Sequence, residues 1–321
     1  MNDSLACDSP LTCEALAQRL ALTPLLRDVC LRGGDYRGLD ARKARFEGVD
    51  ARGARFDDAQ LEGTQWKRCR LDDAHFGGAR FAGARFDGCG ASHSNWHRAQ
   101  MFRTTWSDCT VTGARLDQAD LSRISWIRCV ASGIVMGAAK VDIAYLKDCD
   151  LAGVDLKQSL WSRVQMRGGD ISGGCFADAR LHLCAFTAVK AVAADFKAAH
   201  APSISFLQCD LRDACFAQAV LNGGKFNRSD LGSTDFTGAM LKMTQWRDSE
   251  AHRAKFCDAH LDHADLSGAS WRNADFSRAV VAGTKMHCAD LDGVVWTGCA
   301  RQEARADDLL LVEAMQWRPA V

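Results

Sequence analysis

The stretch ARFAGARFDGC at residues 79–89 places Phe81 and Phe86 five positions apart, each of them two positions after an alanine. A spacing of five matches neither the 3.6-residue period of an α-helix nor the two-residue period of a β-strand. The same spacing continues far in both directions. Every position from Leu31 to Trp296 whose number ends in 1 or 6 is apolar, which makes 54 positions in one unbroken register. The chain is therefore a long tandem array of five-residue repeats.

This repeat resembles that of the pentapeptide-repeat proteins, whose consensus is A(D/N)Lxx, as in ADLSGASWRNADF at residues 264–276. The resemblance covers roughly residues 31–299. It implies an all-β fold, a right-handed quadrilateral parallel β-helix of about 13 coils. In such a solenoid one coil holds four pentapeptides, and the central apolar residue and the small residue two places earlier both point inward.

Two residue types recur at intervals of 20, which supports four pentapeptides per coil independently. Each face of a coil is then a very short strand, paired with its copies one coil away at a spacing of about 4.8 Å. Identical residues one coil apart are expected to stack as ladders. The members of the two ladders are Cys69, Cys89, Cys109, Cys129 and Cys149, and Phe176, Phe196, Phe216, Phe236, Phe256 and Phe276.

The flanks of the array have helical patterns, and an uncapped β-helix would expose strand edges that promote aggregation. We therefore expect an N-terminal helical cap at residues 1–30, the β-helix at 31–299, and a C-terminal helix at 300–321. Ser9 and Pro10 suit the N-cap and the first position of the N-terminal helix.

The C-terminal helix is expected to present one apolar stripe, formed by Leu310, Ala314 and Trp317. Two interpretations of this stripe stay open. It is either a cap on the solenoid or a dimer contact, as the resemblance to topoisomerase-protecting members of the family implies.

Charge and composition narrow the classes of partner. Forty Lys and Arg residues balance forty Asp and Glu residues, so no overall basic excess is present to attract nucleic acid or anionic lipid. The N-terminus lacks the pattern of a signal peptide, and nowhere do 18 apolar residues run together. We expect a protein that contacts neither a membrane nor nucleic acid directly. A bacterial cytoplasmic location is what the resemblance implies.

The fifteen cysteines raise the question of metal binding or redox chemistry. Their number is odd and no C-x-x-C occurs, so we expect reduced thiols. The Cys ladder occupies an inward position that requires a small residue, which favours a role as core filler, although a disulfide or soft-metal role stays open. Of the nine histidines, His182, His200, His260 and His263 share one face without completing a metal set. We expect no metal and no cofactor.

No catalytic motif stands apart from the repeat, neither a phosphate-cradling glycine loop nor a nucleophile elbow. Because every coil has the same length, no insertion is available to build a pocket. The sequence therefore predicts a protein that is not an enzyme.

The outward positions remain as candidates for function. One face has apolar residues where the repeat is usually polar, and such a strip on a protein surface is typical of a binding site, although scattered surface apolar residues are also normal. The members of this candidate partner-binding face are Ile143, Leu160, Leu183, Val220, Met240, Met243 and Val280. A neighbouring acidic stripe, broken by Lys190, consists of Asp150, Asp170, Asp210, Asp230, Glu250 and Asp290.

Two functions are compatible with these observations. The first is a non-catalytic protein–protein interaction scaffold, which binds another protein or a second copy of itself. Resemblance to long members of the family adds a possible accessory role in a bacterial secretion system of the type VI kind. The second is a DNA mimic that protects DNA gyrase or topoisomerase IV, as quinolone-resistance members of the family do. The zero net charge disfavours the mimic.

Overall fold

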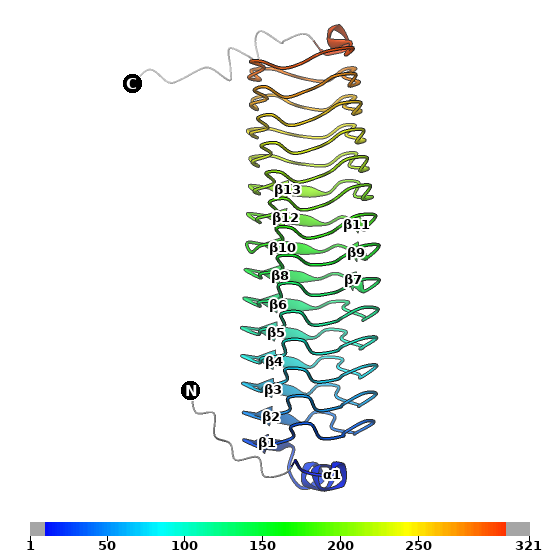
Figure 1. Ribbon diagram of the computed structural model, residues 1–321, viewed down its shortest axis with the longest axis vertical. Coiled ribbons are helices and arrows are strands. Elements are labelled where there is room, and N and C mark those ends of the chain that lie inside the picture. The colour runs from blue at the N-terminus through cyan, green and yellow to red at the C-terminus, as the bar shows by residue number, and fades with distance from the viewer. Residues whose placement is uncertain (1–9, 306–321) are drawn as a thin grey trace, which may run out of the picture. The chain divides into compact units, whose positions relative to one another are not determined.

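The computed structural model describes residues 10–305, which coil around a continuous interior in each of two compact units, Met1–Asp170 and Ile171–Val321 (Figure 1). Within each unit the backbone pairs with itself at a constant sequence interval of 20, always in parallel. The predicted fold class, a parallel β-solenoid with four pentapeptides per coil, is confirmed.

Residues 10–170 of the first unit contain one helix and ten short strands. Strands β1 to β6, β8 and β10 follow one another in one parallel sheet, whereas β7 pairs with β9 in a second. The elements are α1 (Cys13–Leu22), β1 (Leu25–Arg27), β2 (Arg45–Glu47), β3 (Gln65–Lys67), β4 (Arg85–Asp87), β5 (Thr105–Ser107), β6 (Ser125–Ile127), β7 (Lys140–Asp142), β8 (Tyr145–Lys147), β9 (Leu160–Ser162) and β10 (Gln165–Arg167).

The second unit begins with β11 (Arg180–His182), β12 (Ala185–Thr187) and β13 (Ser205–Leu207), of which β12 and β13 pair in parallel. Beyond β13 the coils continue through single parallel bridges in the same register, as far as the bridge between Asp275 and Val295. A 3₁₀ turn, η1 (Arg301–Glu303), follows the last coil.

The backbone hydrogen bonds explain why the register does not slip. The N–H of each central residue donates to a carbonyl of the next coil, as from Leu31 to Asp50 at 2.7 Å. The N–H of the residue before it donates to the previous coil, as from Asp50 to Val29 at 3.1 Å. The central side chains from Leu26 to Met286 are buried, and so are most of the small residues two places before them. A shift by one residue would therefore expose the whole core.

The predicted phenylalanine ladder is confirmed within the second unit. From Phe176 to Phe276 consecutive rings stack with centroids 4.5–5.0 Å apart. The rings from Phe196 to Phe276 also meet rings from neighbouring faces edge to face, as where Phe236 meets Trp246 at 5.2 Å. The interior is thus a close-packed aromatic column.

The N-terminal helix is present, but the expectation that Ser9 and Pro10 begin it is wrong. Helix α1 begins at Cys13, because Thr12 is the N-cap and its hydroxyl accepts from the N–H of Ala15 at 3.2 Å. Leu16 is its buried side chain. The segment after α1 already contains β1, which pairs with β2. The apolar stripe expected at Leu310, Ala314 and Trp317 lies outside the described residues.

Candidate interaction surfaces and a basic notch

In the first unit, two side chains of the candidate partner-binding face are well exposed. Ile143 follows β7 and is 40% exposed, and Leu160 opens β9 and is 53% exposed. Ile143 lies in a turn with φ of 55°, a conformation that is strained for a β-branched side chain. Among the positive-φ positions of residues 10–305 it is the one β-branched residue. An apolar side chain thus occupies a turn position that usually holds Gly, Asp or Arg.

In the second unit, the same face has its largest exposed side chains at turns. Met243 is 67% exposed and Leu183 is 51% exposed. Val220 and Met240 are half-buried and lie opposite each other in adjacent coils, whereas His260 separates Met240 from Val280. The apolar character of this face therefore concentrates around Met240 and Met243.

The acidic stripe is largely paired with neighbouring groups. In the second unit, Arg212 contacts Asp210 at 2.6 Å and lies 3.5 Å from Asp230. The hydrogen bonds from Arg212 hold the pKa of the Asp210 carboxyl below its usual range. Arg272 likewise contacts Asp290 at 2.5 Å.

In the first unit, Asp150 accepts hydrogen bonds from the hydroxyl of Ser132 at 2.8 Å and from the N–H of Ala152 at 2.9 Å. Asp170 forms a parallel bridge with Asp150. Much of the stripe thus stabilises turns and neighbouring coils.

The predicted Cys ladder forms a buried column in the first unit, and its five thiols are free. Hydrogen bonding with Cys109, together with burial, raises the pKa of the Cys129 thiol to about 12. Hydrogen bonding with Cys129, followed by burial, also raises the pKa of Cys149. Metal ligation and nucleophilic reactivity both require the thiolate, so the raised pKa values disfavour both roles at Cys129 and Cys149, whereas hydrogen bonding with Cys89 lowers the pKa of Cys69. The expectation that all cysteines are reduced is wrong for Cys30, which is disulfide-bonded.

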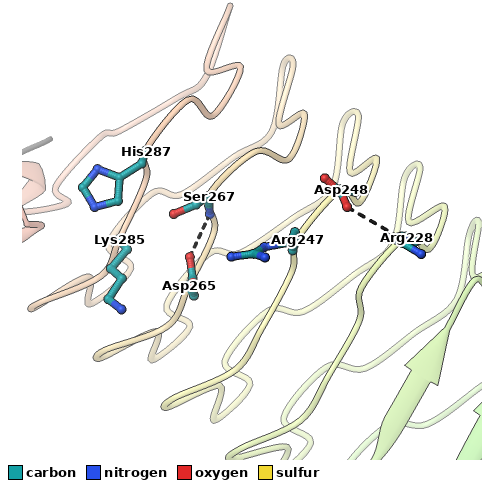
Figure 2. Close-up of a pocket in the computed structure, with 7 residues that line it drawn as sticks. All are labelled: Arg228, Arg247, Asp248, Asp265, Ser267, Lys285 and His287. Atoms are coloured by element: carbon teal, nitrogen blue, oxygen red, sulfur yellow. Dashed lines mark hydrogen bonds and ion pairs between the residues drawn. The ribbon is translucent and has the colours of Figure 1, made fainter. Parts of the chain in front are cut away.

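A notch of about 550 Å³ opens on the surface of the second unit, on the coils that contain Arg228 to His287 (Figure 2). Basic side chains predominate among its lining residues, which are Arg228, Arg247, Asp248, Asp265, Ser267, Lys285 and His287. The expectation that no pocket could form without an insertion is therefore wrong.

Missing side-chain volume creates this notch. Ser267 and Gly268 occupy outward positions that hold Arg247 and Asp248 one coil earlier and His287 and Cys288 one coil later. The coil path is unchanged, but the long side chains on either side now face a gap. Two small outward residues in succession, between coils with long basic residues, were the signal in the sequence that could have identified the notch.

Among the described residues, some charged side chains of the notch have partners and others do not. Arg228 lies 3.5 Å from Asp248, and Asp265 accepts from the N–H of Ser267 at 3.1 Å. Within residues 10–305, neither Arg247 nor Lys285 makes an ion pair. The hydroxyl oxygen of Ser267 is buried and has no hydrogen-bond partner in the described part of the chain.

In residues 10–305, no group of three or more His, Cys, Asp or Glu side chains is arranged to hold a metal ion. No helix in that range has the length and the apolar character needed to cross a bilayer.

The fold is a repeat solenoid of uniform coils, and its outward positions form an apolar face and a basic notch. A family model of pentapeptide repeats matches the chain in eight copies, at residues 37–65, 54–89, 144–182, 214–245 and 259–295, which together span about half of it. The chain belongs to the pentapeptide-repeat family.

Solved structures of the same family are similar to this chain. QnrB1, a plasmid-mediated fluoroquinolone resistance protein, is 19% identical, with 66% of this chain and 98% of that chain covered and a TM-score of 0.40. HetL, involved in heterocyst differentiation regulation in the cyanobacterium Nostoc, is 15% identical, with 70% and 96% covered and a TM-score of 0.36. A search of curated proteins found no match.

Proposed function

We propose that this protein is a non-catalytic scaffold that binds another protein through the apolar face of its second unit. The observation that carries the proposal is Met243, a long apolar side chain that is 67% exposed at a turn. Its neighbours Met240 and Val220 extend the apolar surface across adjacent coils. Methionine suits such a surface because its flexible thioether adapts to different partners.

The backbone cost at this turn supports a functional reason for Met243. Its φ is 58°, in the left-handed region that favours glycine. Glycine does occupy the same position one coil earlier, as Gly223, and two coils later, as Gly283. A non-glycine residue there costs about 1–2 kcal/mol in backbone energy. A partner that covers the side chain would offset that cost, since full burial of a Met side chain contributes about 1.5–3 kcal/mol.

The acidic stripe does not favour the alternative function, topoisomerase protection by DNA mimicry. A mimic needs a continuous negative surface, whereas Arg212 and Arg272 make ion pairs with three of the acids in the second unit. Nothing in the described residues bears on a secretion-system role, so the proposal does not include it.

The test compares wild-type protein with the Met243→Asn variant. Asparagine tolerates the left-handed turn, so the substitution removes the apolar side chain with little backbone strain. The matched control is Ser233→Asn, because Ser233 has a φ of 59° at the same repeat position on another face. Partners are first captured from bacterial cytosol, and each captured protein is then purified and titrated against the three forms.

We expect Met243→Asn to weaken binding of the true partner about 10-fold or more, as loss of one buried apolar anchor implies. Ser233→Asn should leave the affinity unchanged. Equal affinities of all three forms would contradict the proposal. Recovery of gyrase or topoisomerase IV subunits with equal affinity for all forms would favour the mimic instead. Sedimentation of the free protein tests for a second copy as the partner.

A further inference from the structure

We propose that the notch of the second unit binds a phosphate group, either as the free ion or as a monoester on a small organic molecule (Figure 2). This inference is independent of the scaffold function, because the notch lies on the face of Arg247 and Lys285 and not on that of Met243.

The first observation is a pair of cations without ion-pair partners. Arg247 and Lys285 both line the notch, and neither makes an ion pair with any described residue. Other arginines of this unit are paired, as where Arg278 contacts Asp258 at 2.7 Å, although Arg180 and Arg253 also make no ion pair with a described residue. A guanidinium offers two parallel donors and an ammonium offers a point charge, and both are recurrent ligands of phosphate oxygens.

The second observation is the buried hydroxyl of Ser267. Ser267 is 5% exposed and its oxygen has no hydrogen-bond partner within residues 10–305. Leaving a buried hydroxyl without a hydrogen bond is unfavourable, so native structures rarely retain one without a reason. A rotation of the Ser267 side chain toward the notch would let this hydroxyl donate a hydrogen bond to a phosphate oxygen.

The two carboxylates of the notch do not prevent anion binding. Asp248 faces the guanidinium of Arg228 at 3.5 Å, and Asp265 accepts from the backbone of Ser267 at 3.1 Å. The three permanent cations of the lining therefore outweigh two partly engaged carboxylates.

The size of the notch favours an ester over the free ion. Its volume of about 550 Å³ lies within the range of ordinary small-molecule sites and leaves room beyond one phosphate group. The remaining space, next to the stems of the long basic side chains, would receive the organic part of the ligand.

The test is a calorimetric titration of the whole protein with inorganic phosphate and, separately, with phenyl phosphate, with acetate as a carboxylate control. We expect saturable binding of phosphate in the millimolar range and tighter binding of phenyl phosphate. Lys285→Gln should weaken binding about 10-fold, and Ser267→Ala about 5-fold.

The matched control is Lys225→Gln. Lys225 occupies the same repeat position as Lys285 three coils earlier and lies outside the lining of the notch. At about 0.1 M salt its charge is screened over that distance, so the variant should bind within about 2-fold of wild type. An equal loss in Lys225→Gln and Lys285→Gln would show diffuse attraction and overturn the proposal. So would the absence of saturable binding of either phosphate probe, or acetate binding as tight as phosphate.

Discussion

At the scale of single residues, some tryptophans of the interior have their indole N–H groups satisfied by a hydroxyl close by in the sequence. Trp66 donates its indole N–H to the hydroxyl of Thr64 at 3.0 Å, and that hydroxyl donates in turn to the carbonyl of Leu61 at 2.7 Å. The same arrangement recurs at Trp96 with Ser94. At these positions a hydroxyl two residues earlier serves the central tryptophan, whereas Trp126 follows Ile124 and its indole N–H is buried without an acceptor in the described residues.

Thr64→Val should destabilise the protein although it keeps the shape of the side chain. The indole N–H of Trp66 would be left buried without an acceptor, which costs about 1–3 kcal/mol. The measurement is the urea midpoint of the variant against wild type. Thr234→Val is the control, because the hydroxyl of Thr234 donates to the carbonyl of Leu211 at 2.9 Å and no tryptophan depends on it. Equal losses in both variants would contradict this explanation.

Asp50 provides a second prediction at this scale, on the pH dependence of stability. Burial raises the pKa of its carboxyl, but the hydrogen bonds from Arg52 outweigh burial and leave the pKa lowered overall. A carboxyl with a lower pKa in the folded state stabilises the protein above its unfolded pKa of about 3.9. That stabilisation is lost as the pH falls through the folded value.

Asp50→Asn should therefore be less stable than wild type by about 1.5–3 kcal/mol at pH 7, the range for a hydrogen bond to a charged group. The difference should persist at pH 5 and shrink at pH 3 and below. Urea unfolding of both proteins at the three pH values measures it. A gap that stays constant down to pH 2 would show that the charge of Asp50 is not its cause.

At the scale of the turn, the backbone conformation sets which residues are favourable. The residue two positions after each central residue adopts a positive φ, as Ala193 does at 54°. A residue with a Cβ is strained in this conformation. Ala193→Gly should raise the free energy of unfolding by about 0.5 kcal/mol, after the greater entropy of glycine in the unfolded chain is subtracted. The opposite is expected one position later. Ala194 is fully buried, and Ala194→Gly should cost about 1 kcal/mol. Thermal midpoints distinguish the two signs.

Sequence periodicity was sufficient to predict the repeating element, because one steric requirement recurs in every coil. It predicted the inward register, the length of the coil and the phenylalanine ladder, each of which depends only on residues five or twenty apart. It did not predict the start of α1, where Thr12 competes with Ser9 as a cap of similar chemistry. It also did not show which acids are neutralised, although the spacing Asp-x-Arg at Asp210 and Arg212 was visible.

The notch escaped prediction for a different reason. Its walls depend on side-chain volume at outward positions, where the repeat imposes no requirement. Ser267 is ordinary in its own pentapeptide, and it becomes a candidate ligand only beside Arg247 on the preceding coil and Lys285 on the following one. Function in such an array is thus encoded across coils, in residues that the fold leaves unconstrained.

At the scale of the whole molecule, the backbone bonds and ring stacks connect each coil mainly to its immediate neighbours. Stability should therefore be regional. Phe86 stacks on Trp106 at 3.9 Å, and Phe86→Ala should cost about 3–5 kcal/mol locally. Hydrogen exchange followed by mass spectrometry should show faster exchange around residues 60–110 and no change at residues 210–290.

A matching substitution in the second unit, Phe236→Ala, tests the same regional unfolding from the other side. Phe236 stacks between Phe216 at 5.0 Å and Phe256 at 4.9 Å, so Phe236→Ala should accelerate exchange around residues 210–260 and leave residues 40–100 unchanged. If either variant accelerated exchange uniformly along the chain, the array would unfold as a single cooperative block. Binding at the Met243 face would then stabilise every coil equally. With regional unfolding, a bound partner should protect only the coils near Met243, since only those coils open together with its site.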